Sequence, residues 1–88
     1  MNMRKIIGWN LRKHRVERGM SQERLALAAE IDRAYVGRVE RGSENVTTDT
    51  LAALANALGV APAVLLTEPP EGAQEPPSLK SGRKPKAG

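Results

Sequence analysis

The segment from Ser21 to Gly42 constrains the fold of this chain more than any other stretch. Its sequence, SQERLALAAEIDRAYVGRVERG, holds two runs of apolar residues at helical spacing, and the spacing changes phase at Glu30–Ile31. This pattern predicts two short amphipathic helices joined by a tight turn. The apolar residues expected to face their shared core are Leu25, Ala26, Ala29, Ile31, Val36 and Val39.

The second of these predicted helices places polar side chains on its outer face, among them Arg33, Tyr35 and Arg38. Ser21 and Asp32 precede the two helices, and each side chain is expected to accept a hydrogen bond from a backbone N–H of the helix that follows. Two crossed helices of this kind form a helix-turn-helix, whose second helix can enter the major groove of DNA. The pattern therefore favours a protein that reads DNA.

Helical spacing and end signals predict three further helices around this pair. The first is expected from about Arg4 to Arg18. Another is expected after a cap at Thr47 or Thr48, and a short last helix is expected to begin near Pro62. The predicted fold class is therefore all-α, a compact bundle of about five short helices in residues 1–66.

The composition changes after residue 66. Residues 67–88 contain five of the chain's six prolines, and Leu79 is their only large apolar residue. Such a segment cannot bury enough apolar surface to offset the entropy lost on ordering, so we expect a disordered tail. Its four basic and three acidic residues leave a net charge of +3, of the chain's +4, in the folded part.

Composition also excludes several classes of site. The chain has no cysteine, its only histidine is His14, and no apolar run approaches the roughly 18 residues of a membrane span. Disulfides, metal clusters, cofactor motifs and nucleophile–base pairs are therefore not expected, and an enzyme is not predicted. The sequence pI near 10.0 favours polyanionic partners, and we expect a cytoplasmic protein without membrane contact.

Three segments in order, RVERGMSQERLA, RAYVGRVERG and TLAALANALGV, give the chain a resemblance to a known family. Over roughly residues 4–66 it resembles the phage-repressor-like (Xre/Cro-type) helix-turn-helix domains. Within it, DRAYVGRVERGSENVT is most similar to the controller proteins of restriction–modification systems. The resemblance implies a lambda-repressor-like domain that binds double-stranded DNA, as a homodimer on an inverted-repeat operator, and regulates transcription.

Seven residues are expected to contact DNA. Arg33 can donate two hydrogen bonds to a guanine, and Ala34 can rest against a thymine methyl group. Each residue could also have a role that does not involve DNA. Arg38, for example, can form a surface ion pair, and Tyr35 can pack on the preceding helix. The seven predicted contacts are Gln22, Arg33, Ala34, Tyr35, Arg38, Arg41 and Ser43.

The resemblance also implies structural roles for two further sets of residues. Arg15 and Glu40 stand where the family usually has a partly buried arginine–glutamate pair, which would fasten the first helix to the third. The dimer contact is expected at the apolar residues that remain near the end of the bundle. These are Val60, Val64, Leu65 and Leu66.

A second class of function remains open from the sequence. Similar small domains serve as antitoxins or adaptors, whose main task is to bind a protein partner. In that case the tail would be the segment that folds on the partner. The tail lacks the amphipathic pattern that this reading requires, but a partner could also bind the domain itself.

Overall fold

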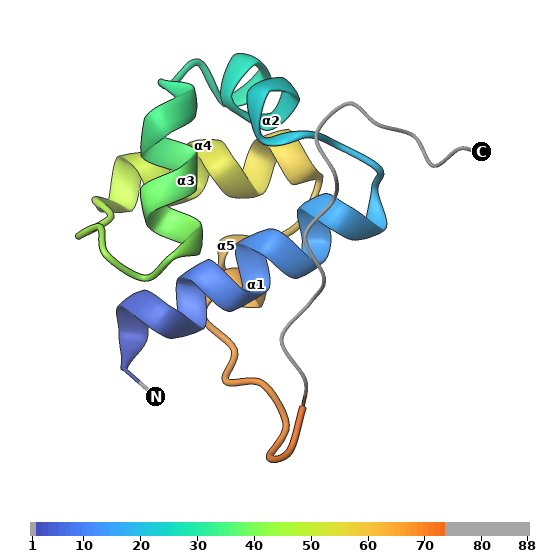
Figure 1. Ribbon diagram of the computed structural model, residues 1–88, viewed down its shortest axis with the longest axis vertical. Helices are drawn as coiled ribbons and strands as arrows, with labels where there is room; N and C mark the ends of the chain where they lie inside the picture. The colour runs from blue at the N-terminus through green and yellow to red at the C-terminus, as the bar shows by residue number, and fades with distance from the viewer. Residues whose placement is uncertain (1, 74–88) are drawn as a thin grey trace.

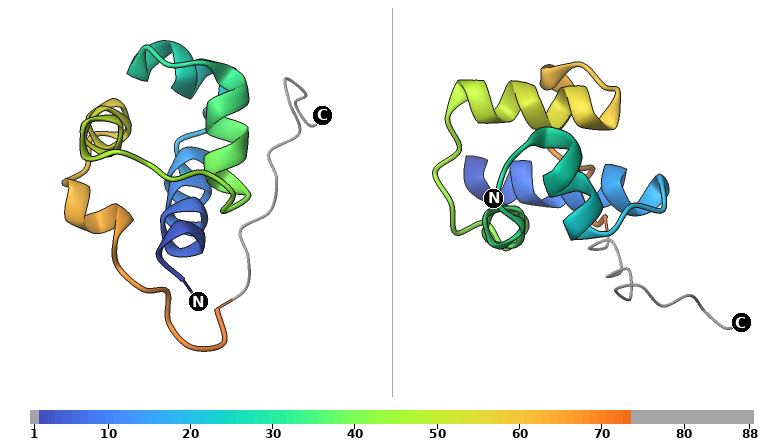
Figure 2. Two further views of the ribbon diagram at one scale, coloured as in Figure 1. Left: turned by 90° about the vertical axis from the view of Figure 1, so that its left-hand side faces the viewer. Right: turned by 90° about the horizontal axis from the view of Figure 1, so that it is seen from above.

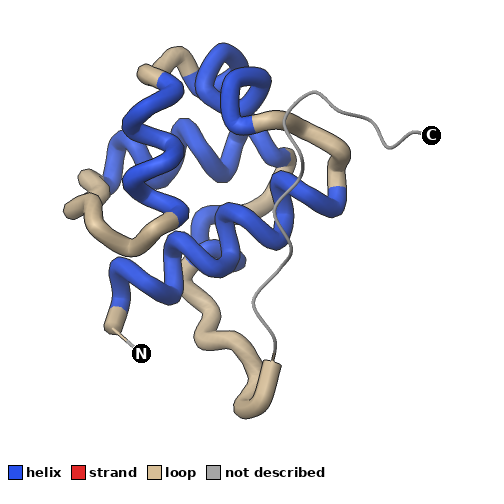
Figure 3. The backbone as a smooth tube through the Cα atoms, in the orientation of Figure 1, coloured by secondary structure: helices blue, strands red, loops and turns tan. Residues whose placement is uncertain are grey.

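The computed structural model describes residues 2–73 and forms five helices within that range (Figure 1). No strand occurs among these residues, and loops join the helices (Figure 3). The predicted all-α bundle is thus confirmed, and its first helix is shifted by only one residue at each end. The helices are α1 (Met3–Glu17), α2 (Gln22–Ala29), α3 (Arg33–Glu40), α4 (Thr48–Leu58) and α5 (Pro62–Leu65).

The helices pack around one small core. α3 packs against both α1 and α2, while α4 contacts α2, α1 and α5. Seen from above in Figure 2, α1 and α4 run alongside each other in separate layers. All five helices contribute to the largest fully buried side chains, which are Leu11, Leu25, Leu54, Leu65, Val36 and Val39. Of the residues expected to face the core of the helix pair, only Ile31 is half-buried, because it lies in the turn at the edge of that core.

Local hydrogen bonds begin two of the helices as predicted. The hydroxyl of Ser21 accepts from the backbone N–H of Arg24 at 3.0 Å, and the hydroxyl of Thr47 accepts from that of Thr50 at 3.1 Å. The side chain of Asp32, by contrast, makes no capping hydrogen bond. The backbone N–H of Tyr35 donates instead to the main-chain oxygen of Asp32 at 3.0 Å, so the donor that a cap would serve already has a partner.

The turn between α2 and α3 contains the only non-glycine residue with a positive φ in the described part of the chain. Glu30 has φ 60° and ψ 44°, the left-handed conformation, and forms the C-cap of α2. A side chain in this conformation costs about 1–2 kcal/mol relative to glycine. The turn itself is well bonded, since the backbone N–H of Ile31 donates to the Ala26 oxygen at 2.9 Å.

At the end of the bundle, one residue of the predicted dimer contact is buried, and the chain after α5 is bonded to α1. Leu65 was expected to face a dimer partner, but its side chain is fully buried in the core of the monomer. Asn10 donates from its amide to the main-chain oxygens of Leu65 at 3.1 Å and Thr67 at 2.8 Å. The chain is therefore held on α1 just beyond residue 66, where the tail was expected to begin. Most of the predicted disordered tail, residues 74–88, lies outside the described residues.

Candidate nucleic-acid interface

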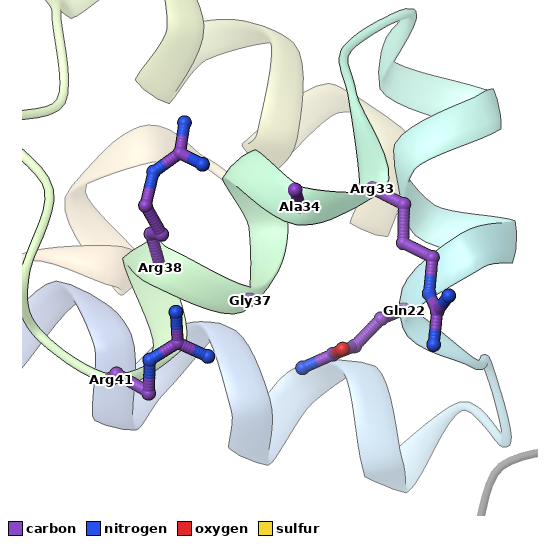
Figure 4. Close-up of a pocket in the computed structure, with 6 residues that line it drawn as sticks. All are labelled: Gln22, Arg33, Ala34, Gly37, Arg38 and Arg41. Carbon is purple, nitrogen blue, oxygen red and sulfur yellow. The ribbon is translucent and has the colours of Figure 1, made fainter.

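The outer face of α3 and the first residue of α2 line an open depression of about 410 Å³ (Figure 4). Five of the seven predicted DNA contacts lie here, and Gly37 joins them. Ser43 lies just beyond α3, where its hydroxyl donates to the Arg38 oxygen at 3.1 Å. Tyr35 is half-buried and packs against the core. The lining residues are Gln22, Arg33, Ala34, Gly37, Arg38 and Arg41.

The period of the α-helix creates this face. Residues 34, 37, 38 and 41 follow one another at three- and four-residue steps, so they lie on one side of α3. Val36 and Val39 fall on the opposite side and are buried. Ala34 and Gly37 leave the middle of the outer face low, while three arginines surround it (Figure 4). A shallow, strongly positive helix face suits the phosphates and base edges of a DNA groove.

A single buried carboxylate fixes the orientation of this face. Arg15 donates from Nε to Oε2 of Glu40 at 2.6 Å and from Nη2 to Oε1 at 3.0 Å, and the two side chains are 3% and 0% exposed. Arg15 also donates to the Met20 oxygen at 2.7 Å. Gln22 donates its amide to Oε1 of Glu40 at 3.0 Å, and Nε of Arg12 lies 3.6 Å from the same oxygen. The carboxylate thus joins α1, α2 and α3, and it holds Gln22 beside the outer face of α3.

The side chain of Arg38 is ordered from two sides. Its guanidinium lies over the ring of Tyr35, 5.6 Å from the ring centroid, at a distance typical of a cation–π contact. Its Nε donates to Oε1 of Glu44 at 2.8 Å. This hydrogen bond, together with the charge of Glu44, raises the pKa of Arg38 above its ordinary value.

Glu44 was not among the site residues predicted from the sequence. It lies in the loop between α3 and α4, six residues after Arg38, so helical spacing could not connect the two. The path of the loop brings the Glu44 carboxylate back to Arg38 on the outer face of α3. The sequence signal that could have suggested it is its charge, an acidic residue three positions after Arg41 in the loop that follows α3.

Two other kinds of site find no support in the described part of the chain. Residues 2–73 contain no group of three histidine, cysteine, aspartate or glutamate side chains that could hold a metal ion. Within the same range, no helix combines the length and the apolar character that crossing a membrane requires.

Comparison with known proteins agrees with this geometry. Residues 11–65, from α1 to the end of α5, match the family HTH_3, described as helix-turn-helix. The chain belongs to this helix-turn-helix family. The predicted resemblance is confirmed, and with it membership of a family of DNA-binding transcription regulators. Proteins of this family are in general not enzymes.

Relatives of this helix-turn-helix protein include both general regulators and control proteins. A hypothetical transcription factor of Neisseria meningitidis is 41% identical over 70 residues, which are 80% of this chain and 66% of the relative. Control protein C.SmaI of Serratia marcescens is 42% identical over 67 residues, which are 76% of this chain and 80% of that protein. The crystal structure of the restriction-modification controller protein C.AhdI of Aeromonas hydrophila has a TM-score of 0.69 and 44% identity, over 70% of this chain and 94% of that one.

Proposed function

We propose that this helix-turn-helix protein is a sequence-specific transcriptional regulator that binds an inverted-repeat operator as a homodimer. Each protomer would place α3 in a major groove. The observation that carries this proposal is the basic depression on α3, in which Gln22 and three arginines surround two small residues. Its relatives come from bacteria, whose DNA lies in the cytoplasm, so we expect a regulator of this kind to act there without a catalytic step.

The geometry suggests which side chains contact bases and which contact phosphates. Arg33 lies on the first turn of α3 and Arg38 lies farther along the helix, and both line the depression, so both could reach base edges. Ala34 is small and exposed between them, which suits contact with a thymine methyl group. Phosphate contacts are assigned to Arg41 and Gln22, which also line the depression, and to Ser43, which lies just beyond α3. Tyr35 acts through Arg38, because its ring lies beneath that guanidinium.

The proposed dimer contact uses the apolar residues that remain accessible near α5. Val60 and Val64 are half-buried and Leu66 is 39% exposed. They stand beside the buried Leu65, so a partner protomer would cover the edge of the existing core. A two-fold contact here would present two α3 helices to the same side of a duplex, about 34 Å apart.

The decisive experiment is affinity selection of the purified protein on random-sequence duplex DNA at near-physiological salt. We expect a two-fold symmetric motif whose half-sites are centred about 10 base pairs apart. Arg33→Ala should then lower specific affinity by about 1–3 kcal/mol and relax preference at one base pair of each half-site. Recovery of unenriched DNA would contradict the proposal and favour a protein partner. An equal loss of affinity on all sequences would show that Arg33 contacts phosphate.

A further inference from the structure

The loop after α3 places the carboxylate of Glu44 against Arg38, on the outer face of α3 that we propose binds DNA. Two hydrogen bonds hold the loop on the end of α3: the backbone N–H of Ser43 donates to the Arg38 oxygen at 3.0 Å, and the Ser43 hydroxyl donates to the same oxygen at 3.1 Å. Glu44, the next residue, accepts from Nε of Arg38 at 2.8 Å. The Glu44 side chain is 25% exposed and that of Arg38 is 44% exposed, so the pair lies at the surface.

The atoms that Glu44 and Tyr35 use determine what remains available on Arg38. Glu44 bonds to Nε, at the side of the guanidinium, and the ring of Tyr35 covers one of its faces. Figure 4 shows the two terminal nitrogens at the outer end of the side chain, and the hydrogen bond to Glu44 uses neither of them. Those nitrogens form the edge that can donate two parallel hydrogen bonds to the O6 and N7 atoms of a guanine.

We propose that Glu44 is a specificity-determining residue, which positions Arg38 to read one base pair and opposes its use as a general phosphate contact. This inference rests on the proposed DNA-binding function. A bidentate contact requires the guanidinium to lie in one plane, and an arginine that is already held there loses less side-chain entropy on binding. The carboxylate also repels any phosphate that approaches Arg38 from the Glu44 side, at every sequence alike.

A purely structural role would not account for the arrangement. Exposed ion pairs contribute little to folding stability, and this pair joins a helix to its own following loop rather than to a distant element. Positioning and repulsion act together on one measurable quantity, the ratio of specific to non-specific affinity. Removing the charge of Glu44 should lower the first affinity and raise the second.

The test compares wild-type protein with Glu44→Gln, Arg38→Ala and the double variant Arg38→Ala/Glu44→Gln. Affinities are measured by fluorescence anisotropy at fixed near-physiological salt on three kinds of duplex: the selected operator, its single-base variants and an unrelated sequence. Glu17→Gln is the matched control, because it also removes one acidic charge and an exposed ion pair, with Lys13 at 3.2 Å, but lies outside the depression.

We expect Glu44→Gln to lower the preference for one base pair at least about fivefold and to bind the unrelated duplex more tightly. Arg38→Ala should lose preference at the same base pair, and Glu44→Gln should cause no further loss of that preference in the Arg38→Ala protein. The control should leave every preference unchanged. This coupling is the signature of positioning, since loss of repulsion alone would act on all sequences equally.

Three results would overturn the inference. The first is an equal change of affinity on every duplex, and the second is a change of base preference that persists without Arg38. The third is loss of the helical circular-dichroism signal in Glu44→Gln, which would assign the residue to the fold. Failure of the wild-type protein to select any motif is a separate result, read before the variants, and it would refute the DNA-binding proposal itself.

Discussion

At the scale of single residues, Gly8 shows how closely two helices approach. A Cβ atom placed on Gly8 would overlap the main-chain oxygen of Val39 and lie 2.8 Å from that of Glu40. Both neighbours are backbone atoms of α3, so neither can rotate aside. Because glycine has no Cβ atom, α1 can lie against the backbone of α3 at Val39 and Glu40.

We predict that Gly8→Ala destabilises the domain by about 1–3 kcal/mol, although alanine is the better helix former, because α1 would have to move away from α3. Gly37→Ala is the matched control, since its Cβ would meet only side-chain atoms, at 3.5 Å or more. It should raise stability by up to about 1 kcal/mol. Urea denaturation measures both, and equal effects of the two substitutions would refute the close approach.

A second residue-scale prediction concerns His14. Burial and the neighbouring charges of Lys13 and Arg18 lower its pKa below 6.5, while Glu17 opposes the shift. Nη1 of Arg18 lies 3.2 Å from His14 Nδ1, and because arginine can only donate, this contact requires the neutral imidazole. The folded state thus binds the proton less readily than the unfolded state. The contribution of His14 to stability is complete above about pH 6.5 and is lost as the pH falls through the folded-state pKa.

The measurement is the melting temperature between pH 7.5 and 5.5. We expect it to fall further for the wild-type protein than for His14→Gln, which has no group to protonate in that range. An equal or larger fall for the variant would show that the ring is not held in its neutral form.

At the scale of the elements, most of the fold could be predicted because its signals are local. The caps at Ser21 and Thr47 and the helical spacing of the core residues depend on neighbours within a turn or two. Helical spacing also explains why Ala34, Arg38 and Arg41 could be predicted to lie on one side of α3. Three features could not be predicted, because each depends on how the chain folds back rather than on helical spacing. They are the burial of Leu65, the hydrogen bonds from Asn10 to the chain after α5, and the contact of Glu44 with Arg38.

The element-scale prediction concerns the buried carboxylate that joins three helices. Arg15→Met would leave Glu40 without its bidentate partner in a site from which water is excluded, and should cost about 3–5 kcal/mol. Lys13→Met removes an exposed pair with Glu17 and should cost at most about 1 kcal/mol. Replacing both partners, as Arg15→Met/Glu40→Leu, should recover part of the loss. If Arg15→Met and Lys13→Met lower the free energy of unfolding equally in urea denaturation, the Glu40 carboxylate does not hold the helices together.

At the scale of the whole molecule, the question is where the domain ends. The sequence places the boundary at residue 66, yet Asn10, 5% exposed, donates to the main-chain oxygen of Thr67, and Pro69 is half-buried. We infer from these contacts that the fold continues to about Pro69. Residues 74–88 hold four basic residues and one acidic residue, so they would add affinity for any DNA without choosing a sequence.

We therefore predict different results from two truncations. A chain ending at Leu66 should lose about 1 kcal/mol, because the buried amide of Asn10 loses one of its two acceptors, and should melt a few degrees lower. A chain ending at Ala73 should melt like the full chain and keep its base preferences, while its affinity falls by the same factor on operator and unrelated DNA, with a shallower salt dependence. Thermal denaturation and anisotropy at several salt concentrations measure these effects. Equal melting of both truncations would move the boundary back to residue 66, and a change of base preference on removing residues 74–88 would show that this segment takes part in sequence recognition.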